Sequence, residues 1–355
     1  MEIQAAELEA LAIRILVAAG ASDADAEVVA GSLVLSDLLG HDSHGVRRLT
    51  DYVRRIHNGL IDPRAAPAAA NTRPGTVVVH GRRAFGQLAA RRAVSELLAQ
   101  VPRQGSGVAV VRECNHIGRL GEYVGELAEQ DLVALAFGNG DPTVAPYGGR
   151  ERRLGTNPLA WAVPRESGRP PVVMDWASSG IAEGKLRVAR DRGEQVAEGL
   201  VLDAAGRPTS TPADFYAGGA LLPFGGHKGY GLSVLIEIVA GLLSGIGIGS
   251  MPGFGQGWGT MLVAFDISAF LPVREFREQT EQFCQVLAET PLAEGAGEVL
   301  VPGEPEERIR LERTRDGIPV TENTWRDLNA LLGTGTGRVH QNATEHQKCG
   351  EAQQP

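Results

Sequence analysis

Cysteine is scarce in this chain of 355 residues, which contains three of them, Cys114, Cys284 and Cys349. They lie too far apart in the sequence to match a disulfide framework or the paired spacing of a zinc site. We therefore predict no metal site and a location in the reducing environment of the cytoplasm.

An excess of positive charge and long apolar runs are also lacking. The net charge is -9, and no basic stripe is dense enough for a protein that binds nucleic acid. No apolar run approaches membrane-spanning length, and Met1 is followed by Glu and Gln rather than by the basic residues of a secretory signal. The composition thus predicts a soluble protein that binds neither nucleic acid nor membrane.

Two common nucleotide-binding signatures are absent. No Gly-x-Gly-x-x-Gly lies between a predicted strand and a predicted helix, and the Gly-x-x-x-x-Gly-Lys-Ser/Thr loop does not occur. The glycines of residues 253–259 alternate with other residues, a spacing typical of a loop. Glycine is nevertheless abundant, at 46 residues, which favours a ligand-binding α/β enzyme with many tight turns over a helical bundle.

Alternating helix and strand patterns predict an α/β protein. The chain is longer than one hydrophobic core usually supports, so we expect two lobes. Several connections are too short for a crossover helix, and this predicts a mixed sheet. The patterns predict strands over 76–79, 108–111, 133–137, 159–163, 171–174, 261–265 and 298–301, helices over 120–129, 182–190 and 229–244, and a connecting segment over 59–74.

The segment Ser36–Arg48 is where we expect the chemistry to be anchored. Ser43 suits the N-cap of a helix whose apolar residues recur from 46 to 56, which places His44 in the first helical turn, where the dipole disfavours a protonated imidazole. Arg48 follows four residues after His44 and therefore lies on the same helical face. The pair provides a proton donor for a carbonyl oxygen and a guanidinium for the adjacent carboxylate. The same pattern also fits a polar helix start with a solvated Arg.

Two further stretches contain candidate binding residues. Asn115-His116 follows a predicted strand, where α/β proteins place functional loops, although a lone loop His is often structural. The turn-rich residues 148–158 include an Arg and an Asn suited to anions, and they also fit an ordinary hairpin.

Two more candidates follow later in the chain. Asp175 ends an apolar run, where a carboxylate is placed to meet ribose hydroxyls or to orient a His. Residues 225–231 are rich in Gly, so their backbone can approach a phosphate closely while Lys228 adds a positive charge. A flexible entry to a buried helix explains this last stretch equally well.

Together these motifs resemble the type 2 malate/L-lactate dehydrogenases, a family of NAD(P)-dependent 2-oxo acid reductases. The resemblance extends from the first predicted helix to about Leu332. It rests on six motifs in the same order: Ser43-His44-Gly45-Val46 with Arg48, Asn115-His116, Gly148-Gly149-Arg150 to Gly155-Thr156-Asn157-Pro158, Val173-Met174-Asp175, Gly226-His227-Lys228-Gly229-Tyr230-Gly231-Leu232, and Val301-Pro302-Gly303-Glu304.

The resemblance implies a mixed-sheet, nicotinamide-binding fold that is not the Rossmann fold, with a helical lobe from both ends of the chain. We expect residues 1–115 and 273–332 to form this helical, substrate-binding lobe, and residues 116–272 to form the cofactor-binding lobe. Residues 333–355 are expected to be a disordered tail. The resemblance also implies a homodimer. The helix over 232–243 is apolar on nearly every side and so needs burial from more than one direction.

The resemblance further implies roles for individual residues. His44 or His116 resembles the acid/base, and Arg48 resembles the partner of the substrate carboxylate, with Thr156 and Asn157 beside it. The positions that match cofactor contacts are Asn139, Asp175, Trp176, Ala177, His227, Lys228, Gly303 and Glu304. Two departures affect the pocket, since Gly140 replaces a common Ser and Trp176 replaces a common Met.

Between the two histidines the sequence favours His44 as the proton donor. Its predicted first-turn position keeps the ring from permanent protonation and puts Arg48 beside it, whereas no sequence neighbour of His116 would tune that ring.

The expected reaction is hydride transfer between NAD or NADP and C2 of a small 2-oxo or 2-hydroxy acid. One alternative is reduction of a cyclic imino acid such as piperideine-2-carboxylate. The other is a non-catalytic nucleotide-binding protein on the same scaffold. The sequence does not fix the choice between NAD and NADP, nor the exact substrate.

Overall fold

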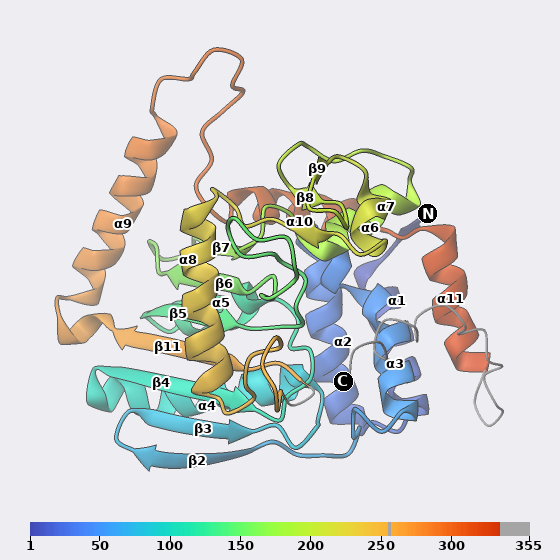
Figure 1. The fold of residues 1–355 in the computed structure, drawn as a ribbon. Coiled ribbons are helices and arrows are strands. Elements are labelled where there is room, and N and C mark those ends of the chain that lie inside the picture. Colours follow the sequence, from blue (N-terminus) through green and yellow to red (C-terminus); the bar gives the residue numbers. More distant parts are fainter. Residues whose placement is uncertain (255–256, 334–355) are drawn as a thin grey trace.

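A seven-stranded mixed sheet forms the centre of the computed structural model, which describes residues 1–254 and 257–333 (Figure 1). The strand order is β2-β3-β4-β11-β5-β6-β7, with β3 and β4 parallel and the other neighbours antiparallel. The strands are β2 (Ala68–Arg73), β3 (Thr76–His80), β4 (Ser106–Arg112), β11 (Thr260–Asp266), β5 (Leu132–Gly138), β6 (Pro158–Val163) and β7 (Val172–Ala177). The predicted α/β fold with a mixed sheet is confirmed.

Helices cover both faces of this sheet. The parallel pair β3 and β4 needs a long crossover, which α4 (Gly86–Gln104) provides, and α5 (Leu120–Glu129) packs beside it against β5 and β6. Side chains of β5 alternate between buried and half-buried, as a strand covered mainly on one face requires. On the other face, α8 (His227–Ile236) continues into the π-helical turn η3 (Glu237–Leu242), which contacts β5 and β11.

A helical unit packs against one end of the sheet. It contains α1 (Ala5–Ala18), α2 (Asp23–Leu38), α3 (Leu49–His57) and α11 (Glu322–Gly333), around a core that includes Leu8, Leu33, Tyr52 and Leu328. The short strands β1 (Glu2–Ile3) and β12 (Ile318–Pro319) pair and join the two ends of the chain. Both ends therefore contribute to one helical unit.

A small third unit lies above the helical unit in Figure 1. Its core includes Val144, Leu186 and Phe215. Its elements are α6 (Glu183–Asp191), β8 (Val201–Leu202), β9 (Pro208–Thr209), α7 (Pro212–Tyr216) and β10 (Ala220–Leu221). The remaining elements are η4 (Ile267–Ala269), α9 (Val273–Ala288) and α10 (Glu304–Asp316). No helix of the described residues is both long and apolar enough to cross a membrane.

Several predicted boundaries are wrong. The segment over 59–74 is not only a connection, because residues 68–73 form the edge strand β2, whose exposed side chains gave no apolar signal. Residues 298–301 were predicted as a strand but do not form one. The next residue, Pro302, joins this segment to the sheet, because its carbonyl accepts a hydrogen bond from the Val173 N–H. Strand β7 runs through Asp175 to Ala177. The helix predicted over 229–244 begins at His227, and its second half is π-helical.

The proposed division into two lobes stays a prediction. The central sheet takes β2, β3 and β4 from the first predicted lobe, and β5, β6, β7 and β11 from the second. The predicted tail after Gly333 lies outside the described residues.

Candidate active site

The loop that contains His44 and Arg48 is built differently from the prediction. Two short 3-10 turns, η1 (Asp42–His44) and η2 (Val46–Arg48), precede α3, so His44 is not in the first turn of an α-helix. Ser43 caps no helix; its hydroxyl lies 2.9 Å from Nδ1 of His44. The predicted N-cap and the dipole argument are therefore wrong.

Asp37 is the reason for this conformation. Its buried carboxylate accepts a hydrogen bond of 2.8 Å from the backbone N–H of Val46, which an α-helix start would have left free. Gly45 packs so closely that a Cβ there would lie 1.7 Å from Oδ1 of Asp37. Burial raises the pKa of the Asp37 carboxyl to about 8. This contact fixes the direction in which the loop leaves α2.

His44 and His116 meet although 72 positions separate them in the sequence. Their rings stack with centroids 5.3 Å apart and an angle of 28° between the planes. Nδ1 of His116 accepts a hydrogen bond of 3.3 Å from the Gly118 N–H and lies 2.9 Å from the hydroxyl of Tyr52. Gln87 in turn donates to that hydroxyl at 2.8 Å. His116 thus has an orienting neighbour that the sequence did not reveal.

The charges around the two rings favour an anionic ligand. Burial first, and then the nearby positive charge of Arg48, lower the pKa of His44 to about 3. The same two causes, followed by His44 and Arg55, lower the pKa of His116 well below its usual value. Arg48 donates from Nε to the carbonyl of Ser43 at 2.7 Å, which holds its guanidinium beside the rings. A bound carboxylate would neutralise this charge and raise both histidine pKa values.

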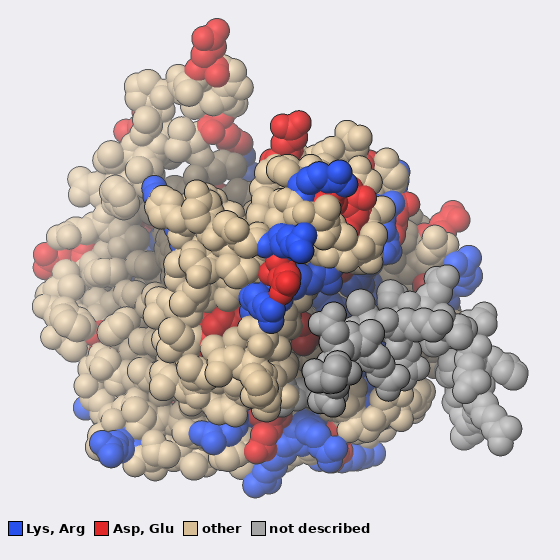
Figure 2. Space-filling model, in the orientation of Figure 1, with Lys and Arg blue, Asp and Glu red and all other residues tan. Residues whose placement is uncertain are grey.

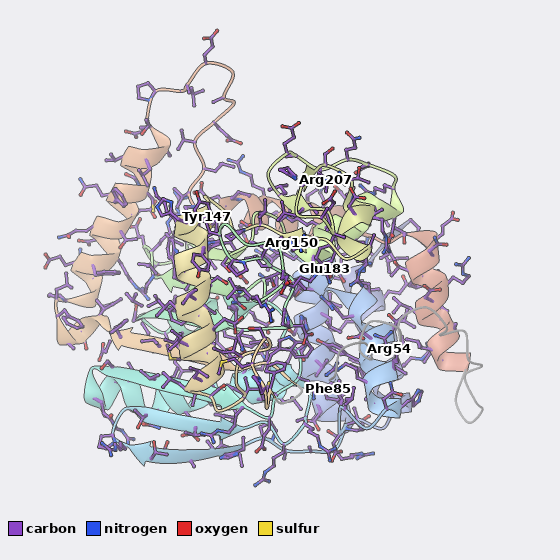
Figure 3. The ribbon with its side chains drawn as sticks, viewed as in Figure 1. Arg54, Phe85, Tyr147, Arg150, Glu183 and Arg207 are labelled. Carbon is purple, nitrogen blue, oxygen red and sulfur yellow. The ribbon has the colours of Figure 1, made fainter. Side chains whose placement is uncertain are left out.

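These groups line one cavity of about 770 Å³, which opens between the helical unit and the small third unit. Figure 3 labels Glu183 on α6 and Arg54 on α3, which stand on two sides of it. The predicted site residues that line this cavity are His44, Arg48, His116, Asn139 and Thr156. Thr143 also lines it, and its hydroxyl is buried without a hydrogen-bond partner among the described residues, which suits a polar ligand group.

Asn139 and Asn157 are engaged in the protein interior. The buried carboxylate of Glu237 accepts hydrogen bonds from the Asn139 amide at 3.1 Å and from the Asn157 amide at 2.9 Å. Asn157 has no exposed surface and also donates to Ser233 at 2.8 Å. The amide of Asn157 therefore faces η3 and α8, while its role in substrate binding stays a prediction.

The predicted cofactor residues on β7 lie outside the lining of the main cavity, and Gly303 approaches the same strand at Val173. Gly303 follows Pro302, whose carbonyl accepts the hydrogen bond from Val173 of β7 at 3.2 Å. The Asp175 carboxylate accepts a hydrogen bond of 2.7 Å from the Gly121 N–H at the start of α5. Burial raises the pKa of the Asp175 carboxyl. Asp175 thus has a structural partner, and Trp176 and Ala177 follow it on the same strand.

His227 and Lys228 begin α8, next to a second cavity of about 580 Å³. Its lining includes Gly225 and Gly226, which both have left-handed φ values, 56° and 63°. The preceding segment contacts the end of β7, since the Phe224 N–H donates to Ser178 O at 3.0 Å. The structure therefore connects this Gly-rich loop to the Asp175 strand.

Sequence reasoning missed Tyr52, Arg55 and Trp258. The guanidinium of Arg55 lies over the Trp258 ring at 5.0 Å, and Trp258 meets the His116 ring edge-on at 5.9 Å. Arg55 follows seven residues after Arg48, a spacing that keeps both on one helical face and was the available signal. In the sequence, Tyr52 could be recognised only as an apolar residue of a helix. Its role as a hydrogen-bonding residue was not visible, because the partners of its hydroxyl are distant in sequence.

Comparison with known proteins identifies the family. The family model described as malate/L-lactate dehydrogenase matches residues 3–329, almost all of the described chain. The chain belongs to the malate/L-lactate dehydrogenase family. Membership places it among oxidoreductases that act on hydroxy acids.

Individual members of the malate/L-lactate dehydrogenase family match over nearly their full length. A malate dehydrogenase of Pyrococcus horikoshii is 32% identical over 90% of this chain and 91% of its own. A Delta(1)-pyrroline-2-carboxylate/Delta(1)-piperideine-2-carboxylate reductase of Pseudomonas putida is 34% identical over 92% and 96%. The solved structure of a putative malate/lactate dehydrogenase from E. coli superimposes with a TM-score of 0.89 at 30% identity, covering 95% and 96%.

Proposed function

We propose that this protein transfers a hydride between a nicotinamide cofactor, NAD or NADP, and C2 of a small 2-oxo or 2-hydroxy acid. The observation that carries the proposal is the stacked pair His44 and His116 beside Arg48, a guanidinium without a carboxylate partner among the described residues. A guanidinium binds a carboxylate through two parallel hydrogen bonds. An imidazole next to it can exchange a proton with the C2 oxygen.

Within this pair we propose His116 as the residue that exchanges the proton. Nδ1 faces the Tyr52 hydroxyl and the Gly118 N–H, so Nε2 is the ring nitrogen left for the substrate oxygen. In reduction the protonated ring would give its Nε2 proton to the C2 oxygen and keep the Nδ1 proton, which the Tyr52 hydroxyl can accept; in oxidation Nε2 would take the proton back. The Tyr52 hydroxyl can donate to Nδ1 or accept from it, and so it supports the neutral and the protonated ring. His44 then lies beside the substrate carboxylate with Arg48.

The bound cofactor would supply the hydride for reduction or accept it for oxidation. The residues we propose to hold it are Asn139, Asp175, Trp176, Ala177, His227, Lys228, Gly303 and Glu304. The buried hydroxyl of Thr143, which has no partner in the described part of the chain, and the glycines at 138 and 140 in the cavity wall support a ligand that approaches the backbone closely. Thr156, which also lines the cavity, would contact the substrate.

A cofactor-oxidation assay tests the proposed function. The purified protein is mixed with NADH or NADPH and a panel of 2-oxo acids and cyclic imino acids. We expect turnover of at least one 2-oxo acid, because Arg48 and the histidines match a carboxylate next to a carbonyl. Turnover of cyclic imino acids alone would favour the activity named for the Pseudomonas putida relative. Oxidation with no member of the panel would contradict the proposal and favour a non-catalytic nucleotide-binding protein.

We also propose a homodimer formed through the apolar face of α8 and η3. Four large side chains there are exposed by 45–60%: Leu235, Ile238, Leu242 and Leu243. Figure 2 shows few charged side chains over the part of the surface where α8 lies. Because Glu237 on the inner side of η3 holds Asn139 and Asn157, this helix connects the proposed interface to the cavity wall. The substrate sites would then lie close to the interface.

The cytoplasmic location stays a prediction from the cysteine spacing.

The double substitution of Leu235 and Leu242 by Glu is expected to convert the dimer to a monomer. Two leucines that are already half-buried contribute about 0.7 to 1.5 kcal/mol each when a partner covers them, and a buried carboxylate adds a desolvation cost. Sedimentation velocity measures the change. The matched control is Val17→Glu on α1, where an apolar side chain is 37% exposed, and it should leave the mass unchanged. A wild-type protein that sediments as an active monomer would contradict the proposal.

A further inference from the structure

The carboxylate of Glu237 binds both ends of the long loop between β5 and β6. The described ladder between these strands ends at the pair Phe137 and Leu159, so the next facing positions of the antiparallel register are 139 and 157. There the Glu237 carboxylate takes the place of ladder bonds, because its Oε2 accepts from the Asn139 amide at 3.1 Å and its Oε1 from the Asn157 amide at 2.9 Å. One side chain therefore joins the two segments where the sheet no longer does.

Glu237 has no cation partner within residues 1–254 and 257–333. Its side chain is buried, at 2% exposure, and its third hydrogen bond comes from the Gly155 N–H at 2.9 Å. Neutral N–H groups alone compensate this buried charge, and hydrogen bonds to a charged acceptor are stronger than those between neutral groups. The segments that donate to Glu237 are thus fixed to it through their strongest available bonds.

Asn157 has an unusual backbone conformation that its side-chain bonds maintain. Its φ is 36°, in the left-handed region that residues other than Gly rarely adopt. Besides Glu237, its buried amide binds the hydroxyl of Ser233 on α8 at 2.8 Å. Such backbone conformations are costly and occur preferentially at functional sites. The preceding residue, Thr156, lines the main cavity, so α8 and η3 control the backbone from which Thr156 enters it.

Asn139 is held from the same side. Its amide also donates to the Gly247 carbonyl at 3.0 Å, and its Oδ1 accepts from the Gly259 N–H at 2.8 Å. The π-helical turn η3 packs directly against this amide, since a Cβ at Gly241 would lie 2.7 Å from Nδ2 of Asn139. Turns of this type are frequent at functional sites. Asn139 and both its neighbours along the chain line the main cavity, so η3 also fixes this part of the wall.

We propose that Glu237 is a positioning residue of the active site, which sets the distance between segments 138–141 and 155–158 of the cavity wall. Residues of both segments line the main cavity, whereas Glu237 itself does not. The inference rests on the proposed function, in which Asn139 contacts the cofactor and Thr156 the substrate. A change at Glu237 therefore alters ligand binding although this side chain lies outside the cavity.

Cofactor binding and steady-state kinetics in two variants of Glu237 test the proposal. Fluorescence titration without any acid gives the dissociation constants of NADH and NADPH, and turnover of a 2-oxo acid gives KM and kcat. Glu237→Gln retains one acceptor oxygen but sets an NH₂ group against the Asn139 amide. We expect the dissociation constant and KM of the cofactor that the wild type binds to rise by about 10-fold. Glu237→Ala removes every acceptor, so kcat/KM should fall by about 10²-fold, the effect of a displacement of about 1 Å.

Glu122→Gln is the matched control. Glu122 is also a buried carboxylate, 8% exposed, but it accepts from Arg91 and Ser32 and belongs to the lining of neither cavity described above. Both Gln variants should unfold at a lower temperature than the wild type. A purely structural role would end there, because a less stable enzyme of correct shape loses active molecules but keeps its cofactor dissociation constant. We expect that pattern for Glu122→Gln and not for Glu237→Gln.

Two results would overturn the proposal: wild-type dissociation constants and KM in Glu237→Gln, or an equal rise in Glu122→Gln. A wild type that binds the cofactor but reduces no acid would contradict the proposed function, while the titration would still decide the role of Glu237. A wild type that binds neither NADH nor NADPH would contradict both. If Glu237→Ala does not fold, Glu237→Gln decides.

Discussion

Replacement of His116 by Ala is expected to lower kcat by about 10²- to 10⁴-fold, the usual contribution of a general acid or base. The loss should appear in kcat rather than in cofactor affinity, because His116 acts on the proton that joins or leaves the C2 oxygen. The same reasoning predicts a different result for His44→Ala. This variant should mainly raise KM for the acid, since Ser43 orients that ring beside Arg48 and the described residues show no further chain of hydrogen bonds to it.

Tyr52→Phe separates the chemical role of His116 from a structural one. The phenyl ring keeps the buried packing of Tyr52 but removes the hydroxyl that lies 2.9 Å from Nδ1. We expect the pH profile of kcat/KM to shift. The thermal stability should fall by about 1 to 3 kcal/mol, because the buried Gln87 amide loses its acceptor. If His44→Ala is the variant that loses kcat and His116→Ala retains it, the two roles are reversed and the preference from the sequence is restored.

The second large effect is expected for Gly45→Ala. A Cβ at this position would lie 1.7 Å from Oδ1 of Asp37, whose carboxylate is buried and bonded to Val46, so the loop has to move. Overpacking of this kind costs about 1 to 3 kcal/mol of stability. A displacement of about 1 Å in the residues that position a substrate costs about 10²-fold in rate. We therefore expect kcat/KM to fall by about that factor or more, as measured in steady-state kinetics, with a lower midpoint in thermal unfolding.

Gly125→Ala provides the control for this prediction. Gly125 lies within α5, and a Cβ there would meet no atom within 4 Å. Ala is favoured over Gly inside a helix by about 1 kcal/mol, so this variant should keep its activity and gain stability. Wild-type kinetics in Gly45→Ala would show that the contact with Asp37 does not position His44 and Arg48.

The sequence by itself determined the elements whose signals are local. Helix α5 has the predicted bounds of 120–129, β5 is one residue longer than predicted at each end, and β6 begins one residue earlier than predicted. Ser22 caps α2, a residue type typical of that position, through the bond from Asp25 N–H to its hydroxyl. Apolar periodicity and caps depend on neighbours within one or two turns, so a sequence contains them directly. The motifs also identified the family and put His44, Arg48 and His116 among the site residues.

Only the tertiary structure decided how these residues are used. The conformation of residues 42–48 depends on Asp37, and the orientation of His116 depends on Tyr52 and Gln87. The exposed edge strand β2 exists because β3 offers it a partner. Most of these contacts join residues that are distant in sequence. The contact of Asp37 with Val46 instead replaces the α-helical start that residues 42–48 would otherwise prefer. A buried polar group must find its partner wherever the fold places one, so the pairing becomes known only when the chain is folded.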